Sequence, residues 1–334
     1  TDDPSSRMPP EGLRLTTQEV EVLTRWIEAG AKFDQHWAFR PVLKQTPPEV
    51  SDTSWTRNPI DAFVLARIES AGLKPSPHAS PATLAKRVAY DLTGLPPDPI
   101  LLKQFLDNPD EDGYRSLIDA LLRSKHFGER WGRHWLDKAR YADSDGYEKD
   151  RPRPNAWLYR DWVIDAVNQD MPFNQFTLEQ LAGDLLEEPS DQQRLATAFH
   201  RQTLTNTEGG VDKEEFRVEA TFDRTETTAA VWMGLTMGCA KCHSHKYDPI
   251  SQQDYYSVYA IFNQTADVDR SDDFPVLPLP TSEQLRAISE IEAGIKSLQL
   301  EKKEKSDDSL DAMIQEQQKK LSATRNAFTK TPIM

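Results

Sequence analysis

The chain has 334 residues, a net charge of −14 and 37% hydrophobic residues. It is long enough for two domains, or for one domain with appendages. The acidic balance argues against a nucleic-acid partner, because nothing here would neutralise phosphates along a groove. An acidic surface suits solubility or a basic redox partner. No segment has 18 consecutive apolar residues, so we expect no transmembrane helix.

Helix signals follow one another along most of the chain. Thr16 and Glu19 form a capping box, and Asn58-Pro59 is a typical helix start that Gly72 ends. Further apolar residues recur at helical spacing, although the threonines near the end of one segment weaken its helical character. Helices are expected over residues 16–30, 58–72, 80–94, 114–123, 129–141, 158–167, 175–186, 192–200, 214–237 and 251–262. We therefore predict a mainly α fold with a multi-helix principal domain.

The composition changes after about residue 267. The Pro-rich stretch 275–280 is typical of a linker. Residues 282–328 are charged, and their apolar side chains recur at three- and four-residue spacing, which predicts an antiparallel helical hairpin resembling a coiled coil. No segment is assigned as a strand.

The two cysteines, Cys239 and Cys242, are separated by two residues and followed directly by His243. This spacing is typical of a c-type haem attachment site. Each thiol can form a thioether with one haem vinyl group, and His243 then lies beneath the ring as the proximal ligand of the iron. Covalently held haem implies redox chemistry and assembly outside the cytoplasm.

Two other interpretations of the cysteine pair stay open. A thioredoxin-like dithiol expects a βαβ context, whereas this region is predicted to be helical. A zinc site needs four ligands, which Cys239, Cys242, His243 and His245 could supply. Haem is the favoured interpretation.

The sixth ligand of such a haem is not marked by a downstream methionine, since Met313 and Met334 lie outside the unit that holds the motif. His134 and His200 are upstream candidates, although a core histidine and a helix cap are their more ordinary roles. An open sixth position would let the haem bind small molecules. The other candidates for lining the pocket are Trp131, Trp135, Met233 and Met237.

An acidic loop contains Asp143 and Asp145 in an alternating pattern with a glycine turn, which resembles part of a calcium loop. The full twelve-residue pattern is absent. Paired carboxylates for glycoside hydrolysis are a further interpretation. The more ordinary one is a solvated loop that Arg151 and Arg153 partly neutralise.

Between His36 and about Thr265 the chain resembles the planctomycete-type cytochromes, specifically the planctomycete cytochrome type two domain. About two-thirds of the chain is covered. One departure is Ser244, where an acidic residue would be expected. The resemblance implies a secreted haem protein whose reaction is poorly defined. The stretches that carry it are residues 36–41, 58–61, 91–97, 128–137, 140–146, 205–210 and 238–249.

The two ends resemble further parts of the same family. Arg7-Met8-Pro9-Pro10 and the following helix are similar to the tail of a class I cytochrome c domain, in which Met8 would be the distal ligand. Residues 331–334 resemble the entry to another domain. We therefore expect an internal fragment of a longer protein. Its expected parts are a cytochrome c-like remnant (1–35), the haem domain (36–267), a linker (268–281), a hairpin (282–328) and the start of a further domain (329–334).

These observations predict a c-type haem protein that transfers electrons within a larger periplasmic or secreted redox protein. Its expected partners are a redox protein and other domains of the same full-length chain. One alternative is a five-coordinate haem enzyme or a gas-binding module. Another is a structural module that binds a glycan or a partner, with cysteines that bind zinc or no cofactor.

Overall fold

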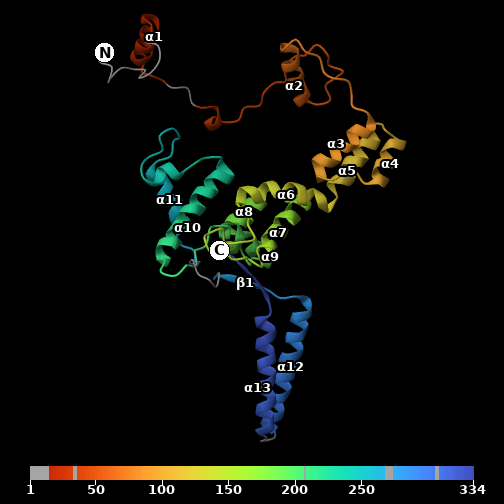
Figure 1. The fold of residues 1–334 in the computed structure, drawn as a ribbon, viewed down its shortest axis with the longest axis vertical. Helices are drawn as coiled ribbons and strands as arrows, with labels where there is room; N and C mark the ends of the chain where they lie inside the picture. Colours follow the sequence, from red (N-terminus) through yellow and green to blue (C-terminus); the bar gives the residue numbers. More distant parts are fainter. Residues whose placement is uncertain (1–14, 33–35, 207, 268–273, 305–307) are drawn as a thin grey trace. The chain divides into compact units, whose positions relative to one another are not determined.

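The computed structural model describes residues 15–32, 36–206, 208–267, 274–304 and 308–334. Within these ranges the chain forms thirteen α-helices and one sheet of two short strands (Figure 1). The predicted mainly α fold is confirmed. None of the described helices is long and apolar enough to cross a membrane. Met8 lies outside the described residues.

The chain divides into two compact units, residues 1–78 and residues 79–334. The first holds α1 (Thr17–Glu28) and α2 (Pro59–Ser70), with a 3-10 turn, η1, at Trp37–Phe39. Both α-helices begin with a capping box, in which the N-cap side chain and the third helical side chain each bond the other's backbone N–H. The capping signals in the sequence therefore predict both starts correctly.

The second unit opens with a small three-helix core. α3, α4 and α5 enclose Phe105, Leu117 and Leu121 together with two buried alanines. Helix α4 was not predicted, although Asp98 caps it and Pro99 occupies its first position. The first five helices of this unit are α3 (Pro81–Thr93), α4 (Pro99–Asp107), α5 (Glu111–Leu122), α6 (Lys125–Ala139) and α7 (Trp157–Asn168).

The main core lies among α6, α7 and the helices that follow them. The Phe176 ring lies 4.8 Å from that of Trp135 and 5.3 Å from that of Trp162. The buried Gln180 side chain accepts hydrogen bonds from both Trp135 and Tyr159. The following elements are α8 (Phe173–Ala182), η2 (Gly183–Leu185), α9 (Asp191–Ala196) and η3 (Thr197–Arg201).

The helix predicted over 214–237 ends earlier than expected. α10 (Lys213–Thr228) passes into a π-helical turn, η4 (Ala229–Met233), which ends at Gly234. Gly234 has φ +65°, the left-handed conformation that commonly ends helices. The next two helical elements are η5 (Gly238–Lys241) and α11 (Gln252–Phe262).

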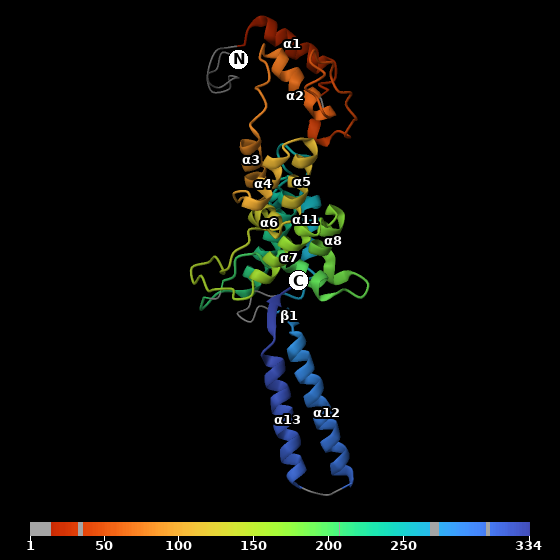
Figure 2. The same cartoon turned by 90° about the vertical axis from the view of Figure 1, so that its right-hand side faces the viewer.

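Near the C-terminus, β1 (Val276–Leu279) pairs antiparallel with β2 (Thr329–Pro332). Between them, α12 (Ser282–Glu304) and α13 (Asp308–Asn326) lie side by side as a helical hairpin (Figure 2). The stretch expected to be a linker thus contains a strand, and the segment expected to open a further domain supplies its partner. Leu277 joins the main core, which ties the small sheet to the helices.

Candidate functional site

The cysteine motif lies in a short 3-10 turn. Cys239 is within η5, and Cys242 is the residue that follows it. Side chains three residues apart lie on the same side of a 3-10 turn. Both cysteines are exposed free thiols. The turn therefore presents two sulfurs on one side, as attachment to a single porphyrin requires.

The His243 ring is exposed, and its Nδ1 lies 2.8 Å from the carbonyl oxygen of Ser244. Because a carbonyl can only accept, Nδ1 carries the proton and donates it. Nε2 is then the nitrogen with the free lone pair. A backbone carbonyl that fixes the tautomer in this way is typical of a histidine that ligates a metal.

The inner side of the turn packs on α11. Met237 and Ala240 are buried with Ile250 and Tyr255 in a small apolar cluster. The Lys241 carbonyl accepts two hydrogen bonds, from the Gln252 amide at 3.2 Å and from the Tyr256 hydroxyl at 3.1 Å. These contacts hold the cysteine turn on a packed surface, which a cofactor site needs for its geometry.

The Lys241 side chain packs on α10. Its ammonium lies 3.7 Å from the centre of the Phe222 ring and 3.3 Å from the Glu219 carboxylate. The cation therefore lies against one side of the motif, and Glu219 partly neutralises it.

His245 has a different role from His243. Its side chain is 6% exposed, and its Nδ1 accepts a hydrogen bond of 2.8 Å from the backbone N–H of Asp248. The Asp248 carboxylate is 3.4 Å from the same nitrogen and does not contact His243 in any described bond. His245 thus closes the turn after the motif. Among the described residues, no three His, Cys, Asp or Glu side chains form a group able to hold a metal ion.

No described contact joins either histidine considered as the sixth ligand to the motif. His134 is exposed on α6, with its ring 5.6 Å from that of Trp131. His200 is buried in η3, where its ring packs 5.1 Å from Phe199 and 5.0 Å from Phe262. Phe262 is the last residue of α11, whereas the cysteine turn contacts the first turns of that helix.

His200 has an unusual environment for a histidine. Both ring nitrogens are buried and make no hydrogen bond of normal geometry within the described part of the chain. Burial, together with the nearby Arg224 guanidinium, lowers the pKa of His200 to about 3. The ring is therefore neutral at ordinary pH and belongs to the core.

The aromatic and methionine candidates lie in several different places. Met237 lies beneath the motif, as described above, while Met233 is about half exposed at the end of η4. Trp135 belongs to the main core and contacts Trp232, the neighbour of Met233, at 5.3 Å. Trp131 is 44% exposed and packs on Phe127.

The acidic loop is organised by arginines. Asp145 is 3% exposed and accepts from Arg151 at 2.8 Å and from Arg153 at 3.2 Å. Asp143 accepts from the Tyr141 hydroxyl. Both Asp145 oxygens are bonded to guanidinium groups, so the two arginines neutralise this carboxylate as expected, but it is buried and not solvated.

Comparison with known families identifies the chain. Residues 59–267, more than half of its length, match the model of PSCyt2, described as a protein of unknown function (DUF1549). The chain belongs to the PSCyt2 family. The name agrees with the resemblance to the planctomycete cytochrome type two domain, and the matched range of PSCyt2 includes the cysteine motif. No curated protein and no solved structure matches the chain.

The sequence of this PSCyt2 chain does not predict which residues hold the cysteine motif in place. Gln252, Tyr256 and Glu219 act through contacts between different elements, which leave no local pattern. The sequence gives a weak indication that His245 closes a turn, because a polar side chain three residues before Asp248-Pro249 is typical of one.

Proposed function

We propose that the chain carries one c-type haem, attached through Cys239 and Cys242 with His243 as the proximal ligand. We propose further that it transfers electrons as part of a larger redox protein outside the cytoplasm. The observation that carries the proposal is the hydrogen bond from His243 Nδ1 to the Ser244 carbonyl. This bond selects the tautomer in which Nε2 can bind iron.

The donor set fits this cofactor. Two free thiols and one imidazole nitrogen are the groups that c-type attachment uses. When bound, the haem iron supplies reversible one-electron chemistry. The chain's own residues have supporting roles: Ser244 orients the imidazole, Gln252 and Tyr256 fix the turn, and the apolar cluster around Met237 excludes water from its inner side.

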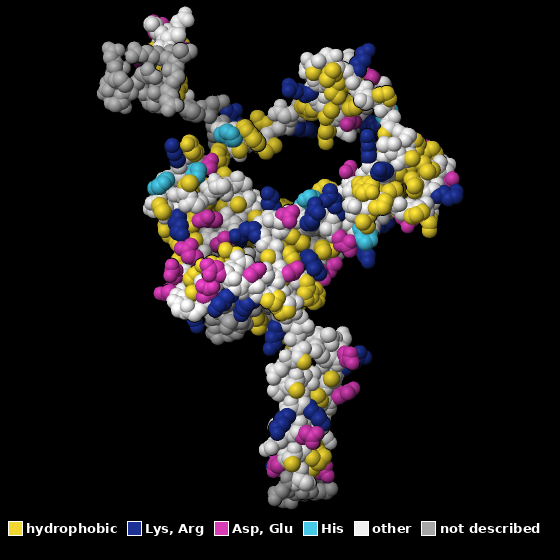
Figure 3. Space-filling model, in the orientation of Figure 1, with side chains coloured by type: hydrophobic (Ala, Val, Ile, Leu, Met, Phe, Trp, Pro, Cys, Tyr) yellow, Lys and Arg dark blue, Asp and Glu magenta, His cyan; other side chains and the backbone are white. Residues whose placement is uncertain are grey.

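The start of α10 favours a basic electron-transfer partner. It exposes the carboxylates of Asp212, Glu214 and Glu215 at the end of the helix away from the cysteine turn, where Arg217 bonds Asn263 just after α11. Figure 3 shows acidic side chains gathered over the region of α10. Complementary charge accelerates the encounter of two proteins, and this effect weakens with salt.

The proposal is tested by expression in a host that matures cytochrome c. We expect a pyridine haemochrome spectrum typical of c-type haem, with one iron per chain. Replacing both cysteines, Cys239→Ser with Cys242→Ser, should abolish haem that resists acid extraction. His243→Gln should change the spin state of the iron, whereas His78→Gln, at an exposed histidine in the first unit, should leave the spectrum unchanged.

A spectrum without c-type haem in the unaltered protein would contradict the proposal. Metal analysis of the same sample distinguishes the haem protein from the zinc-binding alternative, because a zinc module would contain zinc and no iron. Equal spectra for His243→Gln and the unaltered protein would remove His243 as the proximal ligand.

A haem with an open sixth position is the second candidate. The observation that favours it is the placement of His134 on α6 and of His200 inside the core. Five-coordinate ferrous haem binds small ligands at the open position. We expect carbon monoxide to shift the spectrum of the reduced protein. A low-spin spectrum that carbon monoxide does not move would contradict this candidate and leave simple electron transfer.

A further inference from the structure

A cavity of about 260 Å³ lies along one side of α10. Its walls come from three segments: α10 itself, Tyr147 of the acidic loop, and the loop that follows η3. Sites for drug-sized ligands measure about 300–1,000 Å³, so a cavity of this size suits a single small ring. None of its lining residues belongs to the cysteine turn.

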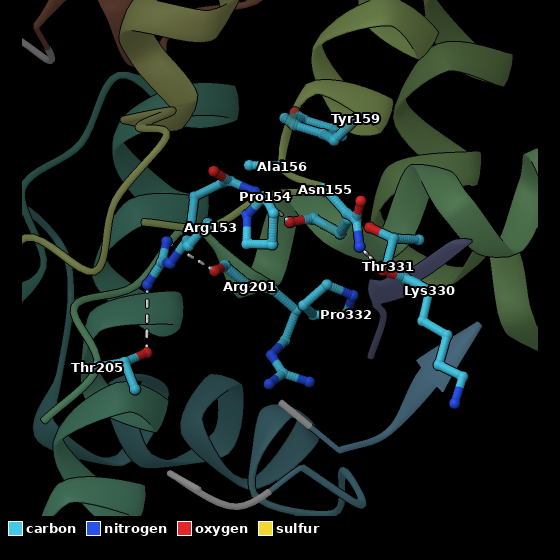
Figure 4. Close-up of a pocket in the computed structure, with 12 residues that line it drawn as sticks. Arg153, Pro154, Asn155, Ala156, Tyr159, Arg201, Thr205, Lys330, Thr331 and Pro332 are labelled. Carbon is cyan, nitrogen blue, oxygen red and sulfur yellow. Dashed lines mark hydrogen bonds between the residues drawn. The ribbon is translucent and has the colours of Figure 1, made fainter. Parts of the chain in front are cut away.

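One arginine joins the two loops that form this cavity. Arg153 pairs with Asp145 in the acidic loop. Its Nη2 also donates to the Thr203 carbonyl at 2.6 Å and to the Thr205 hydroxyl at 3.2 Å, and Figure 4 shows the second of these bonds. The backbone N–H of Thr205 donates to the Asp145 carbonyl at 3.3 Å. The loops are therefore held in place before a ligand arrives, which lowers the cost of binding.

Helix α10 presents two rows of side chains to the cavity. Phe216 and Ala220 form an apolar row, and the Tyr147 ring packs nearly perpendicular to that of Phe216, with the ring centroids 5.9 Å apart. Glu219 and Asp223 form a carboxylate row beside it. Both rows follow the four-residue spacing of one helix face. The occupant should therefore combine an apolar face with hydrogen-bonding groups along one edge.

Both members of the carboxylate row are paired with cations. The Glu219 oxygens lie 3.3 and 3.4 Å from the ammonium of Lys241 in the cysteine turn. Asp223 accepts two hydrogen bonds from the guanidinium of Arg140. A carboxylate accepts about four hydrogen bonds, so each keeps room for an O–H donor. Because the two cations balance the two carboxylates, the cavity favours a neutral ligand that donates hydroxyl groups.

The loop after η3 contributes a buried hydroxyl without a partner. Thr203 lines the cavity and is 7% exposed, and its hydroxyl makes no hydrogen bond within the described part of the chain. Unlike the unpaired side-chain atoms of His200 and Gln202, this hydroxyl is not sealed from solvent. A ligand in the cavity can therefore reach it. A hydroxyl both donates and accepts, and leaving it unpaired in a buried place is costly.

We propose that this cavity binds a small neutral phenol with two hydroxyl groups. The aromatic ring packs on the apolar row, where ring–ring contacts add to the burial of apolar area. Its hydroxyls donate to the carboxylate row, and one of them accepts from the Thr203 hydroxyl. A saturated diol lacks the aromatic face. A sugar would bring hydroxyl groups against the apolar row, which cannot pair them.

Isothermal titration of the whole chain at near-neutral pH with three matched compounds tests the proposal. Resorcinol carries both the aromatic ring and two O–H donors. Its dimethyl ether keeps the ring and loses the donors, whereas the corresponding cyclohexanediol keeps the donors and loses the aromatic ring. We expect resorcinol to bind about tenfold more tightly than either of the other two compounds.

Two substitutions locate the binding at this cavity. Thr203→Val keeps the shape of the side chain and should weaken resorcinol about fivefold without lowering thermal stability, because the hydroxyl has no partner to lose. Ala220→Leu fills the cavity and should abolish resorcinol binding. Thr46→Val and Ala312→Leu, at exposed positions in the first unit and on α13, are the matched controls and should change neither affinity.

Equal affinity for resorcinol and either matched compound, or no binding of resorcinol, would overturn the proposal. Full affinity in Ala220→Leu or in Thr203→Val would overturn it as well. Glucose that binds as tightly as resorcinol would identify a sugar site and reject the phenol. If a variant does not fold, the three compounds on the unaltered chain still decide. The titration requires no haem, so its failure leaves the proposed redox function untouched.

Discussion

His243 and His245 show how a backbone hydrogen bond assigns a role to a side chain. Nδ1 of His243 donates to a carbonyl, whereas Nδ1 of His245 accepts from an N–H group. The first bond leaves Nε2 able to bind a metal, and the second ties the ring into a turn. The sequence distinguishes the two histidines only by spacing, since His243 directly follows Cys242. The hydrogen bond that each ring makes could not be predicted, because it depends on the path of the backbone.

At the same scale, the burial of His200 has a consequence for stability. Its folded pKa of about 3 lies far below the ordinary value of 6.5. The unfolded chain therefore takes up a proton between these two values and the folded chain does not. This contribution to stability is complete above pH 6.5 and is lost as the pH falls towards 3.

We predict that lowering the pH from 7 to 5 costs the protein about 2 kcal/mol of unfolding free energy through this residue. His200→Leu should flatten the stability profile in this window, and His78→Leu should not. Urea unfolding at a series of pH values measures the effect. The buried Asp267 does not interfere: burial acts to raise its pKa, but Arg224 lowers it to about 2, outside the window. An unchanged slope in His200→Leu would contradict the assignment.

At the scale of elements, the sequence predicts the helix starts that are determined by capping residues close by in the chain. The starts of α1, α2 and α11 follow from capping residues such as Thr16, Asn58 and Ser251. β1 and β2 could not be predicted, because each is short, contains a proline and becomes a strand only through pairing with a distant segment. The π-helical turn before Gly234 likewise depends on the packing of Trp232 in the main core.

Gly234 separates α10 and its π-turn from the cysteine turn. A β-carbon at this position would meet nothing within 4 Å, so only the backbone conformation resists substitution. We expect Gly234→Ala to lower the unfolding free energy by about 1 kcal/mol, the cost of a left-handed conformation for a residue with a side chain. Thermal or denaturant unfolding measures this cost.

Gly209 provides the matched control. It also has open space for a β-carbon, but its φ lies outside the left-handed range. Gly209→Ala should leave stability unchanged or slightly higher. If both variants lose the same free energy, the conformation of Gly234 is not the reason that the helix ends there.

At the scale of the whole molecule, the sequence selects the candidate site only in part. It selects Cys239, Cys242 and His243 because their spacing is itself the signal. A sixth ligand and a pocket for the proposed haem are not predictable in this way, because they depend on which helices meet. His134, His200 and Trp135 lie on apolar stripes in the sequence, yet the fold places them at a surface, in a core and beside Trp232.

The charge of the molecule is also unevenly placed. Carboxylates are exposed at the start of α10, whereas the Lys241 ammonium lies beside the cysteine turn. A net charge of −14 alone describes neither surface.

The most direct test of the central claim is the mass of the intact protein under denaturing conditions after expression in a cytochrome c maturation host. The account predicts a mass increase of one haem, retained through denaturation and located on the peptide that holds Cys239 and Cys242. The unmodified mass, or haem that is lost when the protein is denatured, would contradict it.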